Sequence, residues 1–350
     1  MKKTILTICT AVLSIAILLT GCGKSSEQTA SDGQVASVSS TQEKKEGNLN
    51  PLTGLSNMGA GGVGKRPYAV MVSNIKQALP QYGLGSADLC YEVLAEGGIT
   101  RIMALFADPT SVPTTGPVRS VRDYYLDLSA PHQSIFVHFG GSPLGYQSIK
   151  DHHVNDIDGM TLSTVAFNQD KKLAASKGKE HSYFVTADTL AAGLKKKNYN
   201  TSAEVPSAFS FADDEYTPDG GAAQKATVTF STYCKATFDY DAQTKTYLKG
   251  EFGQKQIDAN TGKQIAVDNV LVLTTPCTPI PGDKSNRISV SLNSGSGYYL
   301  TRGQKTDIRW SKGSYSNPLT IKNTAGETQQ INRGKTWVCI IPTGNQVSFS

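Results

Sequence analysis

Three arginines with nearby carboxylates form the densest group of residues capable of chemistry. The arginines are Arg101, Arg119 and Arg122. Each guanidinium presents a planar fork of N–H donors that fits carboxylate or phosphate oxygens, so together they are candidates for an anion-binding site. The carboxylates of the same stretch are Glu92, Glu96 and Asp123. Two interpretations stay open: internal arginine–carboxylate pairs that lock the fold, or an anion site that uses the surplus arginine.

A second candidate lies at Gly140-Gly141-Ser142-Pro143. This sequence predicts a strand-to-helix turn with Ser142 as N-cap and Pro143 as first helical residue. The amides of Gly140 and Gly141, with Ser142, would then be available to an anion, although an ordinary helix start explains the same residues. A serine nucleophile is disfavoured, because the G-x-S-x-G elbow requires glycine where Leu144 stands.

Proton transfer would need a titratable side chain near such a site. The candidate acids and bases are Glu92, Glu96, Asp123 and His181. The adjacent pair His152-His153 is interpreted as solvated, since neighbouring helical residues point in different directions. No C-x-x-C or clustered His/Cys spacing indicates a metal site, so neither a metal nor a cofactor is expected.

The elements that must position these residues divide the folded region into two halves. In the first half, apolar runs predict strands and amphipathic spacing predicts helices. The predicted strands are 67–73, 88–95, 99–106 and 134–139, and the predicted helices are 121–129 and 187–197. Strands 88–95 and 99–106 flank Glu96-Gly97-Gly98, a tight turn with glycines where positive φ is needed.

The second half has a different character, with short alternating segments separated by Gly, Asn, Asp and Pro. These segments are 226–232, 246–249, 269–274, 287–292, 297–301, 306–310 and 335–341. We therefore predict an α/β (α+β) N-terminal domain at 49–204, followed by a smaller β-rich domain at 205–350. The aromatic residues of the second half are expected in its core.

The N-terminus predicts the location of the protein. A basic start is followed by an apolar run and then Leu19-Thr20-Gly21-Cys22, the pattern of a signal peptide (1–21) that ends in a lipobox. The apolar run is shorter than the roughly 20 residues of a membrane-spanning helix. We therefore expect lipidation at Cys22 and anchoring on the extracytoplasmic face of a bacterial cell membrane.

Residues 22–48 are rich in Ser, Gln, Lys and Glu and contain no aromatic residue, which predicts a flexible linker. Loss of the signal peptide leaves only a weak positive excess, so nucleic acid is not an expected partner. The four later cysteines, Cys90, Cys234, Cys277 and Cys339, allow up to two disulfides. A region of about 300 residues needs no such staple, and free thiols are an equally good interpretation.

Several of these motifs resemble one known family. The segments ADLCYEVLAEGGITRIMALF, GPVRSVRDYYLDL and FVHFGGSP resemble the YerB-like lipoproteins, which carry a domain of unknown function (number 3048) with a C-terminal companion domain. The resemblance implies two domains and a lipid-anchored envelope location, but no activity.

The chain departs from the family pattern at three places. Asn168 and Gln169 stand where the family usually has an arginine, Glu180-His181-Ser182 replaces a P-H-N sequence, and Gln256 replaces a histidine. A shorter likeness, limited to the V-R-D-Y-Y-L-D-L run, is to the arginine-rich prenyl-pyrophosphate site of the LytR-CpsA-Psr wall-polymer transferases.

Three functional hypotheses follow. The leading one is a non-catalytic binding or assembly factor near peptidoglycan, whose partners would be cell-wall synthesis proteins or wall fragments. The alternative is an enzyme or carrier that holds an anionic envelope substrate, such as a lipid pyrophosphate or wall polymer, through the arginines. A solute-binding receptor is a weaker third, because such receptors usually have two similar α/β lobes. Arginines converging on an open cleft favour the alternative, and arginines buried against carboxylates favour the binding factor.

Overall fold

The computed structural model describes residues 47–350, which belong to one compact unit. The predicted signal peptide, the predicted lipidation site Cys22 and nearly all of the predicted linker lie outside the described residues. No helix within residues 47–350 is long and apolar enough to cross a membrane.

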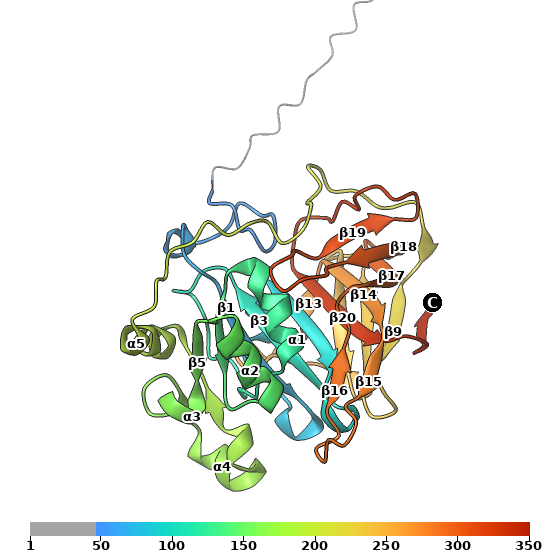
Figure 1. Ribbon diagram of the computed structural model, residues 1–350. Helices are drawn as coiled ribbons and strands as arrows, with labels where there is room; N and C mark the ends of the chain where they lie inside the picture. The colour runs from blue at the N-terminus through green and yellow to red at the C-terminus, as the bar shows by residue number, and fades with distance from the viewer. Residues whose placement is uncertain (1–46) are drawn as a thin grey trace, which may run out of the picture. The chain divides into compact units, whose positions relative to one another are not determined.

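One large sheet runs through both halves of the described chain (Figure 1). Its main path follows the order β19-β18-β17-β14-β20-β2-β3-β1-β4-β5, and β8 pairs with β18. The strands from the first half are β1 (Tyr68–Asn74), β2 (Leu89–Leu94), β3 (Thr100–Phe106), β4 (Ile135–His138) and β5 (Asp156–Asp158). Those from the second half are β8 (Gly221–Ala222), β14 (Asn269–Thr275), β17 (Ser294–Thr301), β18 (Gln304–Ser311), β19 (Thr320–Asn323) and β20 (Thr336–Pro342).

The two halves meet where β2 pairs with β20 in parallel, in a register that places Glu92 opposite Cys339. On its other side β2 forms an antiparallel hairpin with β3. Both strands are buried along their whole length. Side chains of consecutive residues therefore enter two different cores, one on each face of the sheet.

The first face is covered by two helices, α1 (Asp123–Ser129) and α2 (Pro143–Asp151), which lie in front of the sheet in Figure 1. Tyr124, Tyr125 and Leu126 of α1 pack into the same cluster as Tyr91 and Val93 of β2. This cluster is the core of the first face.

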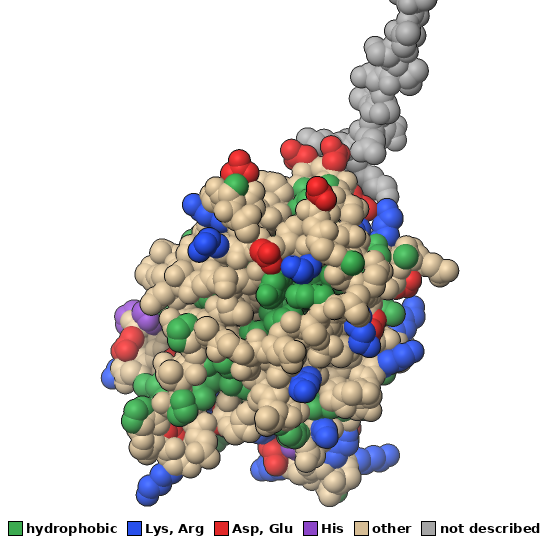
Figure 2. Space-filling model, turned by 90° about the vertical axis from the view of Figure 1, so that its right-hand side faces the viewer, with side chains coloured by type: hydrophobic (Ala, Val, Ile, Leu, Met, Phe, Trp, Pro, Cys, Tyr) green, Lys and Arg blue, Asp and Glu red, His purple; other side chains and the backbone are tan. Residues whose placement is uncertain are grey.

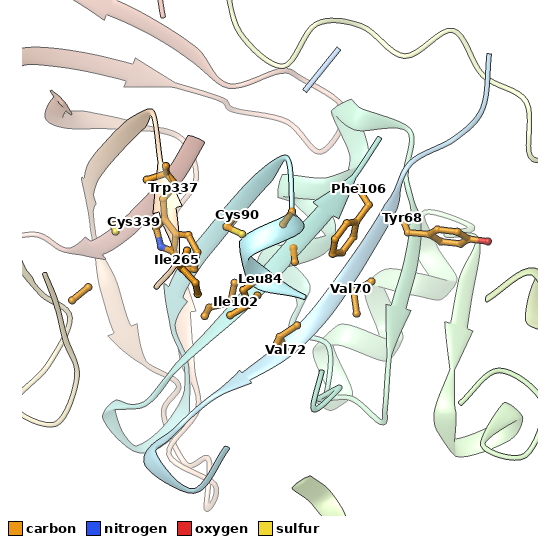
Figure 3. Packing of buried hydrophobic residues seen from close by; sticks show 14 of the residues in the cluster. Tyr68, Val70, Val72, Leu84, Cys90, Ile102, Phe106, Ile265, Trp337 and Cys339 are labelled. Carbon is orange, nitrogen blue, oxygen red and sulfur yellow. The ribbon is translucent and has the colours of Figure 1, made fainter. Parts of the chain in front are cut away.

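The opposite face is covered by α3 (Gly159–Leu162), α5 (Ala187–Lys197) and a second sheet. The second sheet has the order β12-β11-β10-β9-β21, with β13 paired to β11. Its strands are β9 (Lys225–Thr229), β10 (Lys235–Asp241), β11 (Thr246–Glu251), β12 (Gln254–Lys255), β13 (Ala266–Val267) and β21 (Val347–Phe349). Figure 3 shows Cys90, Ile102 and Trp337 in the core of this face.

The remaining elements are short. They are α4 (Lys171–Lys177), the pair β6 (Asn168–Gln169) and β7 (Tyr183–Phe184), and the pair β15 (Cys277–Pro279) and β16 (Ile288–Val290). On the face shown in Figure 2, hydrophobic side chains gather near the middle, and basic side chains are spread around them.

The predicted fold class is confirmed: helices occur in the first half, and the second half consists of strands. The domain boundary at 204/205 stays a prediction and lies between α5 and β8. Cys90, Cys234, Cys277 and Cys339 are free thiols. Of the aromatic residues expected in the core, Trp310, Tyr299 and Trp337 are buried, whereas Tyr298 is only half-buried.

Candidate functional site

Two of the three arginines bind one carboxylate. Arg101 donates from Nη1 and Nη2 to the two oxygens of Glu96, at 2.9 and 2.5 Å. Arg122 donates from Nε and Nη2 to the same two oxygens, at 3.0 and 2.7 Å. Glu96 begins the β2–β3 turn, where Gly97 and Gly98 have φ values of 61° and 77°. Positive φ is inexpensive only for glycine, so this sequence turns sharply enough to return the carboxylate to Arg101 on β3.

The electrostatics of this trio favour structure over proton transfer. Arg101 is 2% exposed and Arg122 is 8% exposed. Burial alone would raise the pKa of Glu96, but hydrogen bonds and charge from Arg101 and Arg122 outweigh it and hold that pKa well below its usual range. Glu96 is therefore ionised and both its oxygens are occupied, which makes it a poor general acid or base.

Arg119 is placed differently. Its backbone amide donates to the carbonyl of Met71 in β1, and its Nη1 donates to the backbone carbonyl of Glu180 at 3.2 Å. Within residues 47–350 its guanidinium forms no ion pair, in contrast to Arg101 and Arg122. Burial lowers the pKa of Arg119, and the nearby charge of Arg101 lowers it further. The charge of Glu180 acts in the opposite direction, but no carboxylate among residues 47–350 is in direct ion-pair contact with this half-buried guanidinium, which leaves it a partner for an external anion.

Arg119 lies on the wall of a cavity of about 720 Å³. This volume falls within the range of small-molecule sites, roughly 300–1,000 Å³. The other lining residues include a second cation, aromatic rings and hydroxyl groups. They are Lys179, Glu180, Phe139, Tyr146, Tyr183, Met160, Ser120, Ser163, Val118, Gly140, Gly141 and Gly159.

The turn at residues 140–143 forms a helix start, as its sequence predicts. The Ser142 hydroxyl accepts a hydrogen bond from the amide of Gly145 at 3.0 Å, and Pro143 is the first residue of α2. The expectation that the Gly140 amide faces an anion is corrected, because this amide donates to Oδ1 of Asp158 at 3.0 Å. The Ser142 hydroxyl is likewise committed to the cap. Gly140 and Gly141 still line the cavity that contains Arg119.

Glu92 lies on the opposite face of the sheet from Arg101, so these two candidates are not in one site. In the β2–β3 pairing, Glu92 is opposite Ile102 and Arg101 is opposite Val93. Side chains one position apart along a strand point to opposite faces. Proximity in sequence was therefore a misleading guide for Glu92.

Glu92 instead belongs to a buried cluster with Lys249 and Glu251 of β11. The ammonium of Lys249 lies 2.6 Å from Oε2 of Glu251 and 3.2 Å from Oε2 of Glu92, and all three residues are buried. The indole N–H of Trp337 donates to Glu92 at 3.0 Å. Burial raises the pKa of Glu92, and the charge of Lys249 opposes this effect. The cluster joins the two sheets.

The carboxylates of this cluster and the thiol of Cys234 are close enough to form a set of metal ligands, since one ligand atom of each lies within 4.8 Å of the others. The ammonium of Lys249, however, already lies between the two carboxylates. A metal ion there would face the repulsion of a buried positive charge. The cluster is therefore better explained as an internal ion pair.

Asp123 and His181 complete the predicted set, but neither lines the 720 Å³ cavity. Asp123 is the first residue of α1 and borders a cavity of about 130 Å³ with Arg122, and burial raises its pKa. His181 is 5% exposed and borders a cavity of about 40 Å³. Burial and the charge of Arg119 lower the pKa of His181.

The positions at which this chain departs from the family pattern lie in separate parts of the structure. Asn168 and Gln169 are exposed in β6. Gln256 is buried and donates to Gln81 at 3.2 Å. Gln81 donates in turn to Asn74, which donates to Glu92, at 2.9 and 2.8 Å. Gln256 is thus connected to the buried cluster and not to the cavity.

Sequence reasoning missed Lys249 and Glu251, as well as the cavity residues Tyr146, Lys179 and Tyr183. A signal for the first two was present, because Tyr247, Lys249 and Glu251 alternate along one strand and therefore share a face. No comparable signal marks the cavity residues. They come from α2, the short 3-10 helix Lys179–His181 and β7, and only the fold brings them together.

Comparisons with known proteins agree with this architecture. Residues 52–200 match the family described as "Protein of unknown function (DUF3048) N-terminal domain", and residues 226–338 match the "Protein of unknown function (DUF3048) C-terminal domain". The chain is 29% identical over 289 residues to "Putative lipoprotein YerB" of Bacillus subtilis (strain 168), covering 82% of this chain and 84% of that protein. The structure is similar to the crystal structure of the YerB protein from Bacillus subtilis, with a TM-score of 0.74 and 27% sequence identity. The match covers 85% of this chain and 98% of the YerB chain.

Proposed function

Because the chain belongs to the DUF3048 family, with both its N-terminal and its C-terminal domain, we propose that it is a lipid-anchored cell-envelope protein that binds an anionic component of the envelope without converting it. In this role it acts as a binding or assembly factor near peptidoglycan, on the extracytoplasmic face of the membrane. Cell-wall synthesis proteins or wall fragments are its proposed partners.

One observation carries the proposal: the three arginines are not equivalent. Arg101 and Arg122 are neutralised by Glu96, whereas the side chain of Arg119 meets only a backbone carbonyl and lines the cavity. A cation on the wall of an open cavity of this size suits an anionic ligand.

Binding is better supported than catalysis. Glu96 has a lowered pKa and two occupied oxygens, Glu92 lies on the opposite face of the sheet, and Asp123 and His181 border other cavities. None of the four candidate acids and bases therefore lines the cavity that holds Arg119. The alternative, an enzyme acting on a lipid pyrophosphate or wall polymer, would have to use a proton carrier that the sequence did not single out, such as Glu180 on the cavity wall.

The anchor fits this role. The relative from Bacillus subtilis is named as a lipoprotein, and Cys22 ends a lipobox in this chain. A flexible linker of the length of residues 22–48 spans on the order of 30 Å. The folded part would then reach ligands in the zone next to the membrane.

The test uses the full chain in detergent and inorganic pyrophosphate as the probe. Thermal unfolding is followed by tryptophan fluorescence, because Trp310 and Trp337 are both buried. A ligand at one hundred times its Kd stabilises the folded state by about 2.7 kcal/mol. We expect pyrophosphate to raise the Tm of the wild type and not that of Arg119→Gln.

Arg309→Gln is the matched control, because Arg309 is an exposed arginine of β18 outside the cavity. It should respond to pyrophosphate as the wild type does. If no protein responds, or if Arg119→Gln responds fully, the proposal is wrong. Release of phosphate from pyrophosphate by the wild type but not by Arg119→Gln would overturn the non-catalytic part in favour of the enzyme.

A further inference from the structure

We propose that the ligand of the Arg119 cavity is a saccharide that carries an anionic group, and that aromatic rings of the cavity bind its sugar ring. This inference rests on the proposed function, because it assigns a chemical class to the ligand of the same cavity. Four features of the cavity wall support it.

The first feature is a pair of positively charged side chains on the same wall. Arg119 and Lys179 both line the cavity. The hydrogen bond from Nη1 of Arg119 to the carbonyl of Glu180 fixes one side of the guanidinium. Its remaining N–H groups make no side-chain hydrogen bond with residues 47–350, so they are available to two oxygens of one phosphate or carboxylate group.

The second feature is an aromatic wall that is held in place. The rings of Phe139 and Tyr183 lie 4.3 Å apart between centroids, at an interplanar angle of 31°. Tyr146 is 40% exposed, and its hydroxyl donates to Oδ2 of Asp158 at 2.9 Å. Rings fixed in this way offer apolar area at a low cost in conformational entropy.

The same carboxylate organises the rest of this wall. Oδ1 of Asp158 accepts hydrogen bonds from the amides of Gly140 and Met160, at 3.0 and 2.9 Å. Asp158 therefore ties three separate lining residues, Tyr146, Gly140 and Met160, to one point. The wall is shaped before a ligand arrives.

The third feature is the mixture of polar and apolar groups. Ser120 and Ser163 line the same cavity as the aromatic residues, and Glu180 adds a carboxylate that is largely exposed. An acyl chain needs a continuous apolar wall, since a carboxylate such as that of Glu180 would lose its water against hydrocarbon, which is unfavourable. A sugar has both apolar C–H faces and hydroxyl groups, so it matches a mixed wall.

The fourth feature is the close contact between the backbone at Gly159 and the ring of Phe139. A Cβ atom at this position would lie 2.1 Å from a ring carbon of Phe139. Any larger residue would push the ring of Phe139 away from its position beside the ring of Tyr183. Glycine at position 159 thus keeps the aromatic wall in place.

The experiment measures Kd values of the full chain in detergent for four probes: inorganic phosphate, glucose 1-phosphate, glucuronic acid and dihexanoyl phosphatidate. We expect glucose 1-phosphate to bind about tenfold more tightly than phosphate, because an aromatic contact adds to the ionic one. Tyr183→Leu should reduce this advantage to less than about threefold and leave the affinity for phosphate unchanged. Arg119→Gln should weaken both.

Tyr146→Leu serves as the second variant, because Tyr146 is more exposed than Tyr183 and its loss disturbs less packing. Tighter binding of glucuronic acid than of glucose 1-phosphate would support the inference and identify the anionic group as a carboxylate. Equal binding of phosphate and glucose 1-phosphate would overturn it and leave the proposed function intact. Preferential binding of dihexanoyl phosphatidate would overturn it in favour of a lipid. Failure of all probes, including pyrophosphate, would instead remove the proposed function.

Discussion

Arg122 binds Glu96 through two parallel hydrogen bonds, although 26 residues separate them in the chain. This pair joins the turn between β2 and β3 to the residue that precedes α1. Arg101 occupies the other side of the same carboxylate. One glutamate thereby fixes a strand, a turn and a helix start, and it removes two of the three candidate arginines from ligand binding.

Glu96→Gln should be strongly destabilising. The substitution leaves Arg101 and Arg122 as buried cations without a counter-charge, which typically costs about 3–5 kcal/mol. Urea unfolding at pH 7 measures the loss. The matched control is Glu180→Gln, because Glu180 is mostly exposed and should change the free energy of unfolding by no more than about 0.5 kcal/mol.

The Glu96 contribution also has a defined pH dependence. Its folded pKa is lowered from the ordinary value of 4.5, so the stabilisation is complete above about pH 4.5 and declines as the pH falls below it. The stability advantage of the wild type over Glu96→Gln should therefore shrink from pH 5 to pH 3. A constant difference over this range would contradict the ion-pair assignment.

Lys249→Met should destabilise the protein by a similar amount, about 3–5 kcal/mol, because two buried carboxylates lose their common cation. Adding Glu92→Gln to Lys249→Met should restore part of the loss, since the second change removes one of the unpaired charges. The coupling free energy from the four proteins of this cycle is the measured quantity. Additive effects would show that Glu92 and Lys249 act independently.

Glu92→Gln should change the pH dependence of the free energy of unfolding in the opposite direction to Glu96→Gln. Burial raises the folded pKa of Glu92 from 4.5 to about 7. Its contribution is therefore fully present below about pH 4.5 and is lost as the pH rises through 7. The free energy of unfolding of the wild type, relative to that of Glu92→Gln, should fall between pH 5 and pH 8. Parallel profiles would rule out titration of Glu92 in this range.

Ser142→Ala tests whether the Ser142 hydroxyl caps α2 or binds the ligand. Loss of the hydrogen bond between the Ser142 hydroxyl and the Gly145 amide should cost about 1 kcal/mol of stability. The affinity for pyrophosphate should stay unchanged, because the hydroxyl is committed to α2. Urea unfolding and the pyrophosphate titration give both values, and a large loss of affinity with unchanged stability would return Ser142 to the anion site.

Local patterns predicted most elements near the arginines. The glycine turn at Glu96–Gly98, the β2–β3 hairpin and the bounds of α5 at Ala187–Lys197 all agree with the sequence-based expectation. They depend on hydrophobic spacing and on turn residues, which act over a few positions. In the second half, the strands that were missed are β8, β10, β12, β13, β15, β19 and β21. All but β10 are only two to four residues long, whereas β10 carries the alternation typical of a strand, with Ala236 and Phe238 buried, so its signal was present and overlooked.

Which residues share a site was harder to predict. It depends on which face of the sheet each side chain occupies and on residues that are distant in the sequence. Strand alternation separates Glu92 from Arg101, and the sequence carried that information once the β2–β3 register was known. The pairing of Glu92 with Lys249 and the meeting of Tyr146 with Tyr183 at one cavity could not be derived in this way. Both require the arrangement of elements that lie far apart in the chain.

The position of β20 has a consequence for the order in which the chain acquires its structure. This strand follows nearly all the other strands of the large sheet in sequence, yet it lies between β14 and β2 near the middle of that sheet. Until Thr336–Pro342 is available, β2 has no neighbour on one side and its edge is unpaired. The N-terminal half therefore completes its part of the large sheet only with a strand from the C-terminal half. The stability of the half that holds the Arg119 cavity is thus tied to a segment that contributes no residue to the cavity wall.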